Sequence, residues 1–155
     1  MSNDLGHIVG GNRVFDSSDP EIKIFNPSNG DVISSIKNAS SETIDKTLKN
    51  SIDAFNEWKG FSIAKRASIL FDYKVLLEKN IDKLASIISE DLGKVHEDAM
   101  GEVRRGIENV EYACGIGEII KGEFNKNISS SVDSWSEFSP LGPVLGITPF
   151  NFPAM

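Results

Sequence analysis

The spacing of apolar residues changes near residue 40, and this change divides the chain into two parts. Before it, apolar residues gather in short runs, at 8–9, 13–15, 22–25 and 32–36. The four runs form two pairs, and turn-forming residues stand between the members of each pair. These are Gly10 and Gly11 in the first pair, and Asn-Pro-Ser-Asn-Gly at 26–30 in the second. Short runs joined in this way are typical of strand–turn–strand units, so the pattern predicts two of them.

After residue 40 the apolar positions recur every three or four residues, which is the period of an amphipathic helix. Four helices are predicted, beginning near Ser40 or Ser41, Ile63, Asn80 and His96. The predicted apolar positions are, helix by helix, Ile44, Leu48, Ile52 and Phe55; Ala67, Leu70, Phe71 and Leu77; Ile81, Leu84, Ile88 and Leu92; and Val103, Ile107, Val110 and Cys114. Gly93 is a natural end for the third helix. We expect the fourth to reach Ile119.

The chain from residue 122 onward is predicted to be extended. Residues 122–134 are polar, but aromatic and β-branched residues recur through 122–140, so we expect a protruding arm or hairpin there. The Gly-rich apolar run that follows predicts a buried strand at 144–147. Directly after it, Asn151 stands between Phe150 and Phe152, with a proline two positions away on either side. An Asn fixed at a strand's carboxyl end presents an amide donor where open α/β sheets bind ligands.

Composition removes several classes of function. The 155 residues favour one domain, and the hydrophobic and charged fractions, 39% and 25%, are ordinary for a soluble protein. The net charge of −7 gives no electrostatic reason to bind nucleic acid or an anionic membrane. A single Cys excludes an internal disulfide framework, which fits a cytoplasmic location.

Six short motifs occur in the order in which they occur in aldehyde dehydrogenases. They are residues 26–33, 54–58, 64–67, 76–78, 90–94 and 147–153, and the last, Ile-Thr-Pro-Phe-Asn-Phe-Pro, is the most distinctive. The chain therefore resembles the amino-terminal third of this family. The resemblance implies an α/β fold of short β-hairpins, four helices, a protruding β arm and the first strand of a Rossmann-like cofactor domain. It divides the chain into 1–121 and 141–155 of the NAD-binding domain, with 122–140 as part of an oligomerisation arm.

Two segments narrow the resemblance. Residues 101–114 and 149–155 are most similar to the CoA-acylating methylmalonate-semialdehyde dehydrogenases. That resemblance implies oxidation of malonate or methylmalonate semialdehyde with NAD as cofactor. CoA is then the co-substrate that takes the acyl group, with loss of CO₂, to give acetyl- or propionyl-CoA. It also implies a homo-oligomer, usually a homotetramer.

The resemblance also implies roles for single residues. Asn151 would donate its side-chain amide to the oxygen of the thiohemiacetal formed when a Cys attacks the aldehyde, and is the candidate catalytic residue. Thr148 and Phe150 would line the nicotinamide side of the site. The alternatives are a turn Asn that bonds its own backbone and plain packing at a strand end.

Arg105 is the candidate for binding the carboxylate of the substrate, because a planar guanidinium suits bidentate recognition. The alternative is a solvated helix arginine paired with Glu102 or Glu108, and the neighbouring Arg104 could take the same role.

Other chemical residues have simpler interpretations. Cys114 falls on the apolar face of its helix and is predicted to lie in the core. His7 and His96 have no partner at metal-ligand spacing, so we predict surface residues and no metal site. The charged stretch 90–94 is predicted to be a solvated helix end.

The family's nucleophilic Cys has no counterpart at a matching position in this sequence. We therefore expect the chain to be the opening piece of a longer enzyme, inactive and poorly stable by itself. Two other hypotheses remain open: an NAD(P)-dependent aldehyde dehydrogenase that hydrolyses its acyl-enzyme, and a stand-alone helical interaction module. The coding sequence beyond Met155 distinguishes the module from the enzymes.

Overall fold

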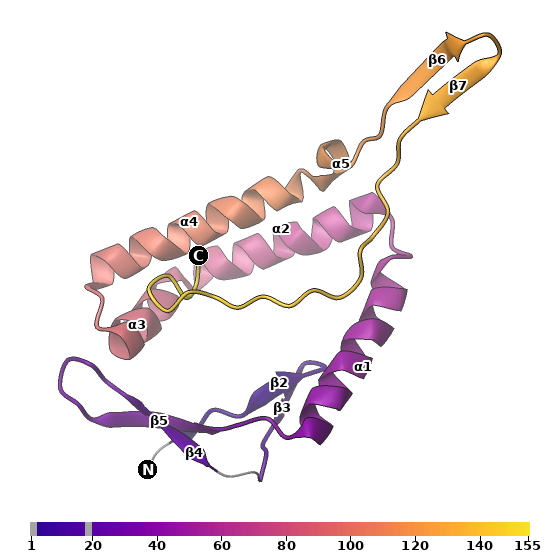
Figure 1. The fold of residues 1–155 in the computed structure, drawn as a ribbon. Helices are drawn as coiled ribbons and strands as arrows, with labels where there is room; N and C mark the ends of the chain where they lie inside the picture. Colours follow the sequence, from indigo (N-terminus) through magenta and orange to yellow (C-terminus); the bar gives the residue numbers. More distant parts are fainter. Residues whose placement is uncertain (1–2, 18–19) are drawn as a thin grey trace.

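The computed structural model describes residues 3–17 and 20–155. Its first part is built from short strands (Figure 1). Strands β2 (His7–Val9) and β3 (Asn12–Val14) form an antiparallel hairpin, and β4 (Glu21–Phe25) pairs antiparallel with β5 (Val32–Lys37). Both predicted strand–turn–strand units are confirmed. A further strand that the sequence pattern did not predict, β1 (Asn3–Asp4), lies parallel to the other edge of β5.

Helices make up most of the remainder, at the positions that the apolar period predicts. They are α1 (Ser41–Trp58), α2 (Ile63–Lys79), α3 (Ile81–Leu92), α4 (His96–Cys114) and the short α5 (Ile116–Ile119). The Ser40 hydroxyl caps α1 by accepting a hydrogen bond from the Thr43 N–H at 3.2 Å. Gly93 ends α3 in the left-handed conformation, with φ of 77°. None of the helices in the described chain is both long and apolar enough to cross a membrane.

The fourth predicted helix was expected to continue to Ile119, and this was wrong. Helix α4 stays regular through Gly101 and Gly106 but ends at Cys114. The Gly115 N–H then bonds to the Tyr112 carbonyl at 3.1 Å, which tightens the last turn, and α5 starts as a separate element.

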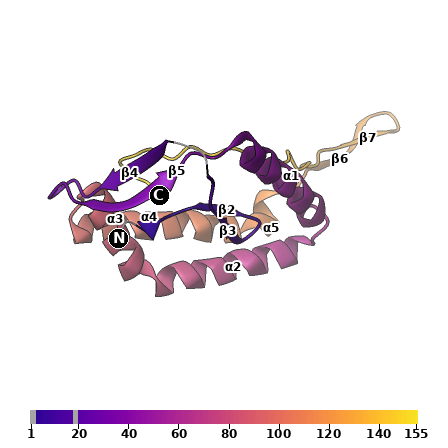
Figure 2. The same ribbon diagram turned by 90° about the horizontal axis from the view of Figure 1, so that it is seen from below.

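The core lies where α2, α3 and α4 pack together, and Figures 1 and 2 show α2 and α4 running side by side. Its buried members are Ala85, Ile88, Ala99, Val103 and Ile107. Ile88, Val103 and Ile107 are predicted apolar positions, whereas Ala85 and Ala99 were not among them. Both alanines lie three or four residues from a predicted position, so they share the faces that the helical period indicates.

The apolar face of α1 is open instead. Ile44, Leu48 and Ile52 are 48%, 57% and 52% exposed, because within the described residues α1 makes only limited contact with β2 and no extensive contact with the helical core. Phe71 of α2, predicted to face inward, is also exposed. The helical period identifies an apolar face correctly, but not whether another element covers it.

Residues 124–135 form a hairpin that projects from the body of the molecule (Figure 1). Strand β6 (Phe124–Ser129) pairs antiparallel with β7 (Val132–Trp135), and the side chains of β6 are exposed throughout. The predicted protruding arm is therefore confirmed as a hairpin.

From β7 the chain returns along the helices and ends beside α4 (Figure 1). The predicted strand at 144–147 is not formed: this stretch has no regular secondary structure, and Val144, Leu145 and Ile147 are at least 84% exposed. A strand needs a neighbour for its backbone N–H and C=O groups, and no segment of the described chain pairs with this one.

Candidate functional site

Residues 136–155, which follow β7, form a return segment that runs back to the helices. Asn151 lies in a turn of this segment, beside the α3–α4 connection and α4. Its backbone carbonyl accepts a hydrogen bond from the Lys94 ammonium at 2.9 Å. Its side chain is exposed, and within residues 3–17 and 20–155 the amide makes no hydrogen bond. The alternative of a turn Asn bonding its own backbone is therefore not observed. The backbone is held and the amide is available to another group.

Lys94 follows Gly93 in the short connection between α3 and α4. Besides the Asn151 carbonyl, its ammonium contacts the Glu102 carboxylate at 2.6 Å and lies 4.3 Å from the centre of the Phe152 ring. Its side chain is only 16% exposed. The prediction that residues 90–94 form a solvated helix end is wrong for Lys94, because three groups from two other parts of the chain surround its charge.

Glu102 supplies the other half of this arrangement from within α4. Its side chain is 1% exposed, one carboxylate oxygen accepts from Lys94, and the other accepts from the Ala154 N–H at 2.8 Å. Burial raises the pKa of this carboxyl, but the hydrogen bonds from Lys94 and from the backbone of Ala154 and Met155 outweigh it, so the pKa is lowered overall. Glu102 is thus ionised at neutral pH and pairs with Lys94, not with Arg105 as the alternative had it.

A close approach at Gly106 completes the contact with α4. A Cβ added to Gly106 would lie 3.2 Å from the Ala154 carbonyl oxygen, closer than most real Cβ contacts. The absent side chain lets the end of the return segment lie against the helix. Lys94, Glu102 and Gly106 therefore fix residues 151–154 from one side.

The other predicted site residues are exposed, two on the return segment itself and one on α4. Thr148 and Phe150 are exposed, Phe150 by 87%, and directly precede the Asn151 turn. Arg105 is exposed on α4 next to Gly106 and forms no ion pair within the described part of the chain, and the same holds for Arg104. Arg105 thus lies on the same helix that contacts the Asn151 turn, and its guanidinium has no ion-pair partner among the described residues.

Sequence reasoning missed Lys94 and Glu102. A usable signal existed for Glu102, because Ala99, Glu102 and Gly106 are spaced by three and four residues on the buried side of α4. A carboxylate on such a face needs a partner. No local pattern identified Lys94 as that partner, since the pairing spans the α3–α4 connection.

Cysteine and histidine do not form a second site. Cys114 is 6% exposed and lines a cavity with Ile63, Ala64 and Ala67 of α2, so its predicted core position is confirmed. His96 is exposed as predicted. His7 was predicted at the surface, but its Nε2 atom is buried and unbonded within the described chain. Among the described residues, no group of three or more His, Cys, Asp or Glu side chains could hold a metal ion.

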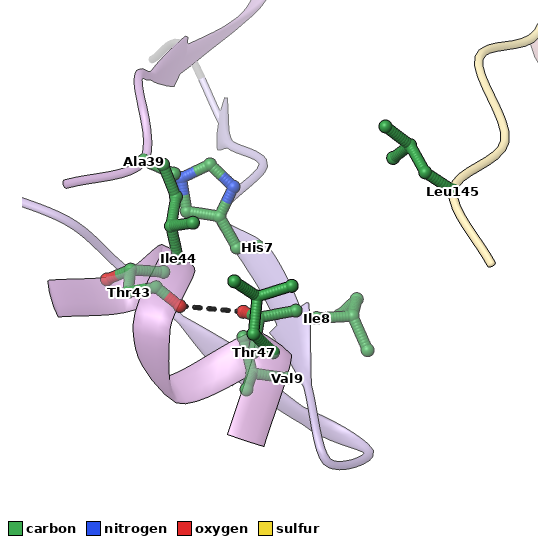
Figure 3. A pocket seen from close by; sticks show the side chains of 9 residues that line it. His7, Ile8, Val9, Ala39, Thr43, Ile44, Thr47 and Leu145 are labelled. Atoms are coloured by element: carbon green, nitrogen blue, oxygen red, sulfur yellow. Dashed lines mark hydrogen bonds between the residues drawn. The ribbon is translucent and has the colours of Figure 1, made fainter. Parts of the chain in front are cut away.

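An apolar groove lies apart from Asn151. Figure 3 shows His7 and Val9 of the β2 strand beside α1, where Thr47 donates its hydroxyl hydrogen to the Thr43 carbonyl at 2.7 Å. The side chain of Ile8 points away from α1, and Leu145 lies across the opening. Its lining includes no residue of 148–155. The groove is therefore part of the open face of α1 and not of the candidate site.

Comparison with known proteins identifies the class. The model of the aldehyde dehydrogenase family matches residues 14–155, so the chain belongs to the aldehyde dehydrogenase family. Its fold is that of the amino-terminal part of these enzymes.

The chain is similar to three particular members of this family, one curated protein and two solved structures. A malonate-semialdehyde dehydrogenase of Pseudomonas aeruginosa is 46% identical over 151 residues, which cover 97% of this chain and 30% of that protein. The crystal structure of a methylmalonate-semialdehyde dehydrogenase from Oceanimonas doudoroffii matches with a TM-score of 0.94 and 43% identity over all of this chain and 31% of that one. A structure from Sinorhizobium meliloti described as the same enzyme, complexed with NAD, gives 0.95 and 34%, and the match covers 100% of this chain and 32% of that one.

The chain spans about 30% of the length of the curated relatives it matches.

Proposed function

We propose that the full-length protein containing this chain is an NAD-dependent, CoA-acylating dehydrogenase of malonate or methylmalonate semialdehyde. The aldehyde loses a hydride, its carboxylate leaves as CO₂, and the remaining acyl group passes to CoA as acetyl- or propionyl-CoA. NAD, when bound, supplies the hydride acceptor. The names of the relatives support this substrate class, and the NAD complex from S. meliloti supports the cofactor.

The observation that carries the proposal is the state of Asn151: its carbonyl is tied to Lys94 while its amide is exposed and unbonded within the described chain. Such an amide suits the oxygen on which negative charge develops when a thiolate attacks an aldehyde. A pre-placed donor of this kind contributes roughly 2.7–4 kcal/mol to the transition state. We assign Asn151 this oxyanion role.

The neighbouring residues complete the proposed site. Phe150, an exposed ring beside Asn151, offers an apolar wall for a nicotinamide, with Thr148 on the same segment. The unpaired Arg105 guanidinium is assigned to the carboxylate of the semialdehyde.

The same proposal assigns the parts of the chain to an NAD-binding domain and an oligomerisation arm. Residues 1–121 and 141–155 belong to the NAD-binding domain. Residues 122–140 belong to an oligomerisation arm, for which the exposed edges of β6 and β7 are suited. We also propose a cytoplasmic homotetramer.

The test uses the full-length enzyme with methylmalonate semialdehyde and NAD, with and without CoA. The proposal predicts propionyl-CoA and NADH in equal amounts. NADH formation that yields only a free acid, whether or not CoA is added, would support the hydrolytic alternative instead.

Arg105→Ala tests the carboxylate assignment, with Arg104→Ala as the matched control one residue away. Loss of a bidentate partner should lower kcat/KM for methylmalonate semialdehyde by about tenfold to 150-fold, from about 1.5–3 kcal/mol for a charged hydrogen bond. Turnover of propanal, which has no carboxylate, should change little. Equal loss on both aldehydes would refute the role.

A further inference from the structure

We propose that Lys94 and Glu102 are positioning residues that set the location of the Asn151 amide, so that the oxyanion donor works only while this ion pair is intact. The inference rests on the proposed oxyanion role of Asn151. Neither residue reaches the reacting atoms through its own charge, because both charges are engaged by protein groups.

The first support is the small number of anchors on the segment. Within the described residues, the only side chains that hydrogen-bond to the backbone of 148–155 are Lys94, which donates to the Asn151 carbonyl, and Glu102, which accepts from Ala154. Phe150 is 87% exposed and Asn151 is exposed, so packing holds this turn weakly. The position of the turn therefore depends on two side chains, Glu102 from α4 and Lys94 from the α3–α4 connection.

The second support is the way in which the two charges are shared. A buried carboxylate needs compensation for both oxygens, and Glu102 finds it in Lys94 for one and in Ala154 for the other. The Lys94 ammonium is shared between Glu102, the Asn151 carbonyl and the Phe152 ring. Moving the turn would break a bond of one partner or the other, so the pair resists displacement in a way that a solvated pair does not.

The third support is geometric. Lys94 bonds the carbonyl of the same residue whose amide is proposed to act, so a shift of this carbonyl carries the side chain with it. Oxyanion donors act at about 2.7–3.1 Å from the developing charge. A misplacement of about 1 Å can lower a rate by roughly 10²-fold.

The test is a double-mutant cycle on acylation in the full-length enzyme, from Lys94→Met, Asn151→Ala and the two combined. Lys94→Met should slow the pre-steady-state formation of NADH by about 10²-fold while KM for the aldehyde and for NAD stays within about twofold. In the Asn151→Ala background, Lys94→Met should have almost no further effect, because the amide that Lys94 positions is no longer there. Lys94→Arg should recover part of the rate.

Lys74→Met is the matched control. Lys74 is also partly buried, at 21% exposure, and bridges two carboxylates, Glu78 at 3.3 Å and Glu111 at 3.4 Å. Within the described chain it forms no ion pair with residues 148–155. It should leave acylation at the wild-type rate. A loss equal to that of Lys94→Met would show a general effect of removing a lysine ion pair and would overturn the proposal.

The remaining outcomes separate this inference from the proposed function. If Asn151→Ala acylates at the wild-type rate, the oxyanion role itself fails. If Asn151→Ala is slow but Lys94→Met is normal, or if the two losses multiply, the oxyanion role stands and the positioning role is overturned. Should Lys94→Met not fold, Lys94→Arg and Glu102→Gln in the same cycle are judged by the same criterion.

Discussion

Replacing Glu102 by Met should loosen the Asn151 segment without removing much volume from α4. The substitution leaves the Ala154 N–H without its acceptor at 2.8 Å and the Lys94 ammonium without its carboxylate at 2.6 Å. Because Glu102 is only 3% exposed, water cannot readily take the place of the carboxylate. The opening of residues 148–155 should become easier while the α2–α3–α4 core stays closed.

The magnitude follows from the lost bond. A hydrogen bond to a charged group contributes about 1.5–3 kcal/mol. At about 1.4 kcal/mol per factor of ten, the amide of Ala154 should exchange its hydrogen roughly tenfold to 150-fold faster. The Lys94 ammonium keeps the Asn151 carbonyl and the Phe152 ring, so complete detachment is not expected.

Hydrogen exchange of the peptide 148–155 in the full-length enzyme measures this directly. Glu111→Met is the matched control on the same helix, since Glu111 is 61% exposed and pairs with Lys74 at the surface, where an ion pair contributes about 0–1 kcal/mol. It should leave the peptide unchanged. Unchanged exchange at Ala154 in Glu102→Met, or equal acceleration in both variants, would refute the reasoning.

Two further predictions concern the same contact. Gly106→Ala places a Cβ 3.2 Å from the Ala154 oxygen and should reduce acylation several-fold, whereas Gly101→Ala meets nothing within 4 Å and should only add up to about 1 kcal/mol of helix stability. Equal activity of the two variants would contradict the close approach. The pKa of Glu102 is lowered in the folded protein, so its ionised form stabilises the fold above the ordinary pKa of Glu, about 4.3. This stabilisation is lost as the pH falls through the pKa of the folded state. Melting temperatures on acidification should therefore fall less in Glu102→Gln, and a fall equal to the wild type would exclude the contribution.

Local elements could be predicted from the sequence because their signals are local. The Ser40 cap, the Gly93 stop and the turn at 26–30 each depend on residues within a few positions, and all three occur as expected. The core face of α4 followed from its period.

What could not be predicted depends on residues distant in sequence. The strand expected at 144–147 needs a neighbouring strand, and the face of α1 needs a covering element. The Lys94–Glu102 pair joins a helix connection to a segment more than fifty positions away, and a charged stretch gives no sign of that. The family resemblance singled out Asn151 as a candidate, because motif residues carry information that periodicity lacks.

The central claim is that Asn151 stabilises the oxyanion of aldehyde attack, and single-turnover acylation in Asn151→Ala of the full-length enzyme tests it most directly. The account predicts that the first burst of NADH is roughly 10²–10³-fold slower, as when other oxyanion donors are removed. Binding of NAD, measured separately, should be unchanged, since the amide acts on the transition state. A burst at the wild-type rate would contradict the account.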